Sequence, residues 1–115
     1  MLYVLGPYSR AVWAGDILYM AGQLGMAPAT NKLVEGGVAV ETEQLLKGLS
    51  AVLAAAGLSM GDVVKANVFL TDMNDFAAMN KVYETFFAAP YPARSTIGVT
   101  ALPGGAVTPI VLRAG

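Results

Sequence analysis

The sequence predicts an α+β fold in which one sheet carries two helices on the same face. Two apolar stripes at helical spacing and several short β-branched segments bounded by glycine and proline turns support this prediction. The segments run in the order two or three strands, helix, strand, helix and two strands, which is typical of an α+β sandwich. At 115 residues, without a visible linker or internal repeat, the chain is predicted to form a single domain over residues 1–115.

The N-terminal part of the chain predicts a β-hairpin followed by a loop. Residues 11–13 and 17–21 have strand character, and Gly15-Asp16 between them has the composition of a tight turn. The next stretch, residues 26–37, contains proline, asparagine and paired glycines, so we expect a loop there.

Residues 40–56 predict an amphipathic helix that ends at Gly57. Its apolar stripe consists of Leu45, Leu46, Leu49, Val52, Leu53 and Ala56. The reverse face carries Glu43 and Lys47, which are spaced to pair, and otherwise small residues that include Gly48. A glycine inside a helix lowers stability by about 1 kcal/mol relative to alanine, so we expect close packing to be the reason for Gly48. Two interpretations of this face stay open: a weakly charged surface, or a face shaped for another protein.

A strand over residues 63–70 leads into the second predicted helix. Asp72 or Asn74 can cap this helix with a side-chain oxygen. Its apolar stripe consists of Phe76, Met79, Tyr83 and Phe86 or Phe87. The stripe indicates that this helix, like the first, packs against the sheet.

Two further strands, over residues 93–102 and 106–114, complete the predicted sheet. Pro109 lacks a backbone N–H, so we expect the last strand to lie at a sheet edge or to contain a bulge. Because both helices are predicted on one face, the other face of the sheet also needs cover. Only 13% of the residues are charged and 56% are hydrophobic, and an oligomer is the simplest cover for such a chain.

The composition excludes several classes of function. Seven Lys and Arg against eight Asp and Glu give a net charge of −1, which predicts no nucleic-acid partner. The absence of cysteine and histidine removes the usual thiolate, general-base and metal-binding groups, so we expect no metal and no cofactor. No apolar run is long enough for a membrane span and no leader is visible, so a cytoplasmic location is expected.

Three residues are candidates for a ligand site on their own chemistry. A guanidinium grips a carboxylate with two parallel hydrogen bonds, so Arg94, at the start of an apolar strand, is either an anion clamp or a solvated strand end. Tyr8 follows a Gly-Pro turn and either faces a ligand or packs over that turn. Asn80 on the second helix either holds a ligand or faces solvent.

Several segments together resemble the RidA family, also called YjgF/UK114. They are "GPYSRAV", "AGQ", "LVEGG", "DVVKANVFLTDMNDFAAMNKVYETFF" and "PYPARSTIGVTALPGGA", which span about residues 6–106 in the family's order and spacing. The resemblance implies a chorismate-mutase-like α+β fold, a homotrimer and clefts between neighbouring subunits. It also implies hydrolysis of reactive enamines and imines, such as 2-aminoacrylate and 2-iminobutanoate, to 2-oxo acids and ammonia.

The resemblance also implies roles for particular residues. Arg94 matches the arginine that clamps the substrate carboxylate, and Tyr8 matches the motif tyrosine; both are expected to be catalytic. Asn80, Gly22 and the backbone of Thr96 are expected to bind the substrate. No histidine or cysteine is required, because a protonated imine is already electrophilic and the site mainly orients it and delivers water.

The chain departs from the family pattern in its last strand. Deaminase-active members often carry a water-positioning glutamate where this chain has Val111, and Ala21 replaces a serine before Gly-Gln. Loss of a positioned acid–base group costs about 10²- to 10⁴-fold in rate, so we expect impaired activity. Carboxylates elsewhere in the chain that the sequence leaves unplaced are Glu84, Asp16 and Glu35.

Two other functions stay open. The chain can be a non-catalytic member that binds a small carboxylate or acts as a scaffold, because Arg94 is kept while the glutamate is not. It can also be a natural or engineered subunit of a larger protein assembly. The uncharged outer face of the first helix, together with Trp13, favours that interpretation.

Overall fold

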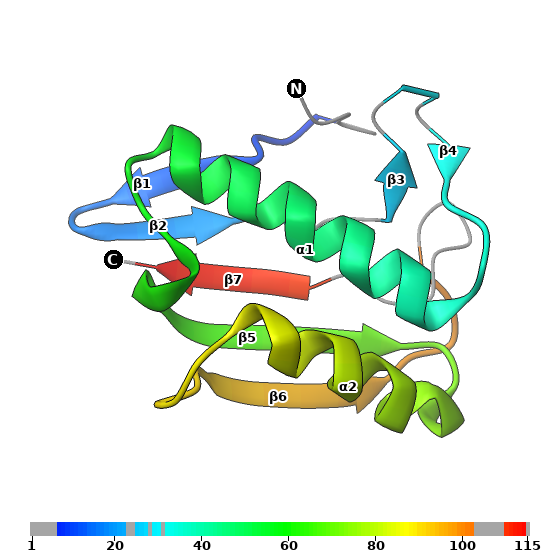
Figure 1. Ribbon diagram of the computed structural model, residues 1–115. Coiled ribbons are helices and arrows are strands. Elements are labelled where there is room, and N and C mark those ends of the chain that lie inside the picture. The colour runs from blue at the N-terminus through cyan, green and yellow to red at the C-terminus, as the bar shows by residue number, and fades with distance from the viewer. Residues whose placement is uncertain (1–6, 23–24, 28, 31, 103–109, 115) are drawn as a thin grey trace.

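The computed structural model describes residues 7–22, 25–27, 29–30, 32–102 and 110–114 (Figure 1). Five strands form one mixed sheet in the order β1-β2-β7-β5-β6. Their bounds are Ala11–Ala14 (β1), Ile17–Met20 (β2), Val63–Leu70 (β5), Ala93–Gly98 (β6) and Ile110–Ala114 (β7). Strands β5 and β6 are parallel, and the other neighbours are antiparallel.

Two helices, α1 (Val38–Ala55) and α2 (Phe76–Phe86), lie on the same face of this sheet (Figure 1). The predicted α+β arrangement is therefore confirmed. The apolar stripes of the helices and the inward-facing residues of the strands form one core. Its buried members are Leu18, Met20, Val38, Leu45, Leu46, Leu49, Leu53, Val63, Ala66, Val68, Leu70, Met79, Tyr83 and Phe87.

The N-terminal hairpin forms as predicted, with Gly15-Asp16 joining β1 to β2. The predicted loop at 26–37 is wrong in part. Within it β3 (Met26–Ala27) and β4 (Lys32–Leu33) pair as a second, two-stranded antiparallel sheet. The sequence pattern missed this hairpin because its strands are only two residues long and have no readable alternation.

The position of the last strand differs from the prediction. Strand β7 lies between β2 and β5 in the middle of the sheet and not at an edge. Pro109, which motivated the prediction, lies outside the described residues. A shift in register does occur against β7, but it falls between Val63 and Lys65 of β5.

Helix α1 ends near the predicted position, and Gly57 follows it with a φ of 80°, a conformation that favours glycine. Gly48 was placed on the reverse face of this helix, but it is buried. The remaining reverse-face residues are exposed or half-buried, as an outer helix face requires.

Alternation along the strands separates two faces of the sheet. In β5, Ala66, Val68 and Leu70 are fully buried under the helices, whereas Lys65 and Asn67 point to the opposite face. On that opposite face, which we call the open face, large apolar side chains are exposed to solvent. They are Val12 (55% exposed), Ile17 (41%), Tyr19 (43%) and Ile97 (50%).

Candidate functional site

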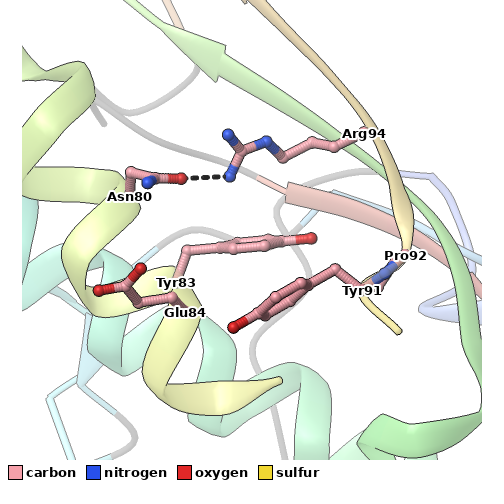
Figure 2. A pocket seen from close by; sticks show the side chains of 6 residues that line it. All are labelled: Asn80, Tyr83, Glu84, Tyr91, Pro92 and Arg94. Atoms are coloured by element: carbon pink, nitrogen blue, oxygen red, sulfur yellow. Dashed lines mark hydrogen bonds between the residues drawn. The ribbon is translucent and has the colours of Figure 1, made fainter. Parts of the chain in front are cut away.

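Arg94 lies on β6, a strand at one edge of the sheet, and its side chain points toward α2 (Figure 2). The alternation of β6 places Arg94 and Thr96 on the helix side and Ser95 on the open face. The Arg94 Nη1 donates a hydrogen bond of 2.6 Å to the Oδ1 of Asn80 on α2. Two residues that the sequence separates by 14 positions therefore meet between the edge strand and the helix.

Two aromatic rings hold the same guanidinium. The Arg94 Cζ lies 4.8 Å from the ring centroid of Tyr83 and 5.5 Å from that of Phe76. Tyr83 is itself packed against Phe87, with ring centroids 4.6 Å apart. A guanidinium over aromatic faces is stabilised electrostatically and loses little freedom when it binds an anion.

The local sequence explains how α2 presents these groups. The Asp72 carboxylate accepts a hydrogen bond of 2.9 Å from the Asn74 N–H, which caps a short 3₁₀ turn, Met73–Asp75, and makes the chain turn tightly after β5. The N-cap of α2 itself is Asp75, which makes no side-chain cap bond, so the predicted capping of this helix by Asp72 or Asn74 is wrong. Strand β5, helix α2 and strand β6 form a parallel β-α-β unit, which brings α2 over the two strands. The Asn80 amide points from α2 toward Arg94, whereas the Glu84 side chain is directed away from the guanidinium (Figure 2).

A pocket of about 410 Å³ opens beside the Arg94–Asn80 pair (Figure 2). Its described lining residues are Asn80, Tyr83, Glu84, Tyr91, Pro92 and Arg94. The pocket therefore combines a cation, an amide and a carboxylate with aromatic walls. Such a mixture of a few polar groups and apolar surface is typical of small-molecule sites.

The charge of Arg94 is not neutralised by a neighbour in the part of the chain that the structure describes: its one hydrogen bond there goes to the neutral Asn80 amide. Burial raises the pKa of the Tyr83 hydroxyl, and the nearby Arg94 charge only partly opposes this rise. The Tyr83 phenol therefore stays protonated at neutral pH. Among its described lining residues, the pocket thus presents one cation without a charged partner to an incoming molecule.

The structure brings together some of the residues expected at the site and separates others. Arg94 and Asn80 are in direct contact. Tyr8 (47% exposed) and Gly22 flank the β1–β2 hairpin, near the opposite edge of the sheet, and are not among the described lining residues (Figure 1). Thr96 is the next inward residue of β6, and its buried Oγ1 has no hydrogen-bond partner among the described residues.

Sequence reasoning missed the aromatic part of the pocket. Tyr83 was assigned only to the core stripe of the second helix, although its spacing of three residues from Asn80 places both near one face. Tyr91 and Pro92 directly precede the strand that carries Arg94, so their proximity was a usable signal. Of the unplaced carboxylates, Glu84 lines the pocket, whereas Asp16 lies in the β1–β2 turn and Glu35 precedes α1.

The described ranges contain neither a metal-binding cluster nor a membrane-spanning helix. The structure groups no three acidic, histidine or cysteine side chains there in a way that could hold a metal ion. Among the same residues, no helix has both the length and the apolar character needed to cross a bilayer.

The fold and the pocket define a small α+β protein with a solvent-facing cavity built around an arginine. The chain belongs to the family described as Endoribonuclease L-PSP, whose model matches residues 1–114, and the resemblance to RidA proteins is confirmed. It is 47% identical over 102 residues to a 2-iminobutanoate/2-iminopropanoate deaminase of Dermatophagoides farinae, covering 89% of this chain and 80% of that protein.

Solved structures agree with this assignment. RidA from the Antarctic bacterium Psychrobacter sp. PAMC 21119 superposes with a TM-score of 0.93 at 44% identity, covering 97% of this chain and 90% of that one. E. coli TdcF with bound serine superposes with a TM-score of 0.91 at 38% identity, covering 96% and 89% of the two chains.

Proposed function

We propose that this protein hydrolyses reactive 2-imino acids and their enamine forms, such as 2-iminobutanoate and 2-aminoacrylate, to 2-oxo acids and ammonia. The observation that carries the proposal is the Arg94 guanidinium, which is held by Asn80 and two rings at the edge of a pocket. Relatives that are nearly half identical bear the name of this activity, which supports the same reaction here.

The chemistry requires little beyond orientation. Arg94 binds the substrate carboxylate with its remaining N–H donors, in the bidentate geometry that guanidinium groups favour. The adjacent C2 of a protonated imine is already electrophilic, so a placed water completes the reaction without a cofactor. Asn80 keeps the guanidinium in position, and the backbone of Thr96 and Gly22 are proposed to line the same site.

We propose that the active form is a homotrimer of the chorismate-mutase-like type, with the cleft between subunits. The exposed apolar residues of the open face support an oligomer, because such a patch is costly in water. Tyr8 lies at the opposite sheet edge from Arg94, so in this arrangement the tyrosine and the arginine of one cleft come from neighbouring subunits. The proposed homotrimer would thus explain how Tyr8 can be catalytic, although it does not line the Arg94 pocket of its own chain among the described residues.

Cleavage of RNA, which the family description names, fits the chain less well. A nucleic-acid strand is bound mainly through several phosphates, and each requires a nearby cation. The whole chain has seven Lys and Arg and a net charge of −1. The pocket of about 410 Å³ has one cationic side chain among its described lining residues, which matches one small carboxylate.

A second candidate function is the binding of a small carboxylate without turnover. The Arg94–Asn80 pair supports binding whether or not hydrolysis follows, and Val111 stands where active relatives are expected to carry glutamate. A larger assembly through the outer face of α1 also stays a prediction. Its test is a mass measurement at high concentration, where a species above three chains would support it.

The proposed hydrolysis is tested by following 2-oxobutyrate and ammonia release from threonine with a pyridoxal-phosphate dehydratase present. Addition of the protein should increase the rate of release above that of the dehydratase alone. Arg94→Ala should lower this increase by about 10²-fold, because truncating a hydrogen-bonded charge partner costs several kcal/mol. Lys47→Ala, which removes an exposed cation of α1, is the matched control and should leave the rate unchanged.

Calorimetry separates binding from turnover. The 2-oxobutyrate product should bind the wild type with measurable heat that disappears in Arg94→Ala. Binding without any acceleration of hydrolysis would support the second candidate and reject the first. Equal heat in both proteins would show that Arg94 does not hold the carboxylate.

A further inference from the structure

The pocket beside Arg94 has more room than a small 2-imino acid fills. Its volume is about 410 Å³. In general, an apolar cavity of about 150 Å³ is large enough to bind benzene. The pocket can therefore hold a carboxylate against Arg94 and, in addition, a side chain of the size of a phenyl group. The ethyl group of 2-iminobutanoate would leave much of this space to water.

The walls of the pocket away from the Arg94–Asn80 pair include two aromatic rings and a proline. Tyr83, Tyr91 and Pro92 line the pocket together, and Figure 2 shows both tyrosine rings turned into the same cavity. The guanidinium lies 4.8 Å from the ring centroid of Tyr83, so this ring already has the cation as a partner. Tyr91 and Pro92 form the apolar wall that remains for a substrate side chain.

The Tyr91 ring is exposed, whereas the Tyr83 ring is buried. Tyr91 keeps 57% of its surface accessible. Within the described ranges Tyr83 packs on Phe87, with ring centroids 4.6 Å apart, and Tyr91 has no such ring contact. Pro90 and Pro92 flank Tyr91, and the fixed φ of proline limits the backbone on both sides of it. Tyr91 therefore offers a firmly placed ring to a ligand, and aromatic rings attract one another in offset or edge-to-face geometry.

The charges of the pocket restrict the side chain of the substrate. Arg94 is the one cation and Glu84 the one carboxylate among the described lining residues. A single guanidinium binds one carboxylate in the favoured bidentate geometry. A second carboxylate, as in the imines of aspartate and glutamate, would find no further cation in this lining and would be repelled by Glu84. The side chain of a suitable substrate is therefore not acidic.

We propose that the site prefers 2-imino acids with an aromatic side chain and that Tyr91 determines this preference. The inference rests on the proposed function and names the class of substrate for the same site. The carboxylate of such a substrate binds Arg94, and its aromatic ring packs against Tyr91 and Pro92. The reaction itself is unchanged. The oxygen of one water bonds to C2, both of its protons pass to the imine nitrogen, and the C–N bond breaks to release ammonia and an aromatic 2-oxo acid.

Imines made in situ by one L-amino-acid oxidase from phenylalanine and from 2-aminobutyrate test the preference. The measured quantity is the ratio of the two kcat/KM values for 2-oxo acid release above the rate with the oxidase alone. The ratio should favour the phenylalanine imine by at least about 10-fold, because one methylene in a hydrophobic pocket alone changes kcat/KM by about 10- to 200-fold. Damage to the fold lowers both rates together and would not move this ratio.

Substitutions of Tyr91 test its role in the preference. Tyr91→Ala should bring the ratio to within about twofold of unity, because the ring that packs against the substrate is lost. Tyr91→Phe keeps the ring and should keep the ratio. Trp13→Ala removes an aromatic side chain of similar exposure (50%) that lies outside the described lining of the pocket, so it should also keep the wild-type ratio.

Calorimetry with the two products separates this inference from the proposed hydrolysis. Phenylpyruvate should bind the wild type at least about 10-fold more tightly than 2-oxobutyrate, and Tyr91→Ala should lose the difference. Equal kcat/KM values and equal Kd values for the two side chains would overturn the inference. A preference that survives in Tyr91→Ala would reject the role of Tyr91. If neither imine is hydrolysed faster but phenylpyruvate still binds more tightly, the proposed hydrolysis falls and the preference for aromatic side chains stands.

Discussion

The two faces of the five-stranded sheet are built from the same strands, yet among the described residues only one of them is covered by helices. Under α1 and α2, strand residues such as Ala66 and Val68 are fully buried. On the open face, Val12 and Ile97 keep about half of their surface in water. Strand alternation produces apolar residues on both faces, so the difference between the faces lies in what covers them. The comparison supports the proposed homotrimer, in which other copies of the chain would cover the open face.

The largest effect is expected where a charge is placed on the open face. Ile97→Asp should convert the proposed trimer to a species with about one third of its mass, because an unpaired carboxylate is costly to bury at an interface. Analytical ultracentrifugation measures this change directly. Val40→Asp, an equivalent change at an exposed position of α1, should leave the mass unchanged. A wild-type mass for Ile97→Asp would mean that solvent, and not protein, covers the open face.

A smaller effect is expected on the covered face. Leu49 of α1 is fully buried, and Leu49→Ala should lower the free energy of unfolding by about 2–5 kcal/mol through lost burial and the cavity left behind. Urea unfolding at fixed protein concentration gives this value. Val40→Ala, on the exposed side of the same helix, should change the stability by no more than about 0.5 kcal/mol. Equal losses in the two variants would contradict the assignment of the core.

The smallest effect concerns a polar atom on the covered face. The Tyr83 hydroxyl is buried without a hydrogen-bond partner among the described residues, so Tyr83→Phe should slightly raise stability at neutral pH. The folded chain holds the phenolic proton more tightly than the unfolded chain, because burial raises the pKa of Tyr83. The stability of the wild type should therefore fall as pH rises above about 10, where the unfolded tyrosine ionises first.

Tyr83→Phe should show a weaker fall over the same range of pH. Urea unfolding of both proteins between pH 8 and about 11 tests this difference. Parallel curves for the two proteins would show that the Tyr83 hydroxyl has another partner or is solvated.

The elements with strong periodicity were predictable from the sequence, whereas their lateral order was not. The α1 stripe through Leu49 and the strand Val63–Leu70 follow from local spacing, which determines each element on its own. The central position of β7 depends on pairing between strands distant in the chain, and no local pattern encodes it. The short β3–β4 hairpin was missed because two-residue strands carry no periodic signal.

In the candidate site, too, individual residues were predictable from the sequence, whereas the contacts between them were not. Arg94 and Asn80 were singled out from their chemistry and from a family resemblance, and the structure brings them into contact. The enclosure of the guanidinium by Tyr83 and Phe76 depends on how α2 packs across β6, which the sequence does not state. The sequence did not place Glu84 at the pocket for the same reason, because the surroundings of an acid on a helix surface depend on how the helix packs in the fold.

The position of β7 has a consequence for how the chain folds. The β1–β2 hairpin and the β5–α2–β6 unit are neighbours in the sheet only through β7, which follows both of them in the sequence. Each unit can form from nearby residues, but the sheet cannot join them until residues 110–114 have left the ribosome. Until then the strand edges of β2 and β5 that pair with β7 stay open, and open strand edges are prone to aggregation, so the pairing of β7 removes this hazard from both units at once.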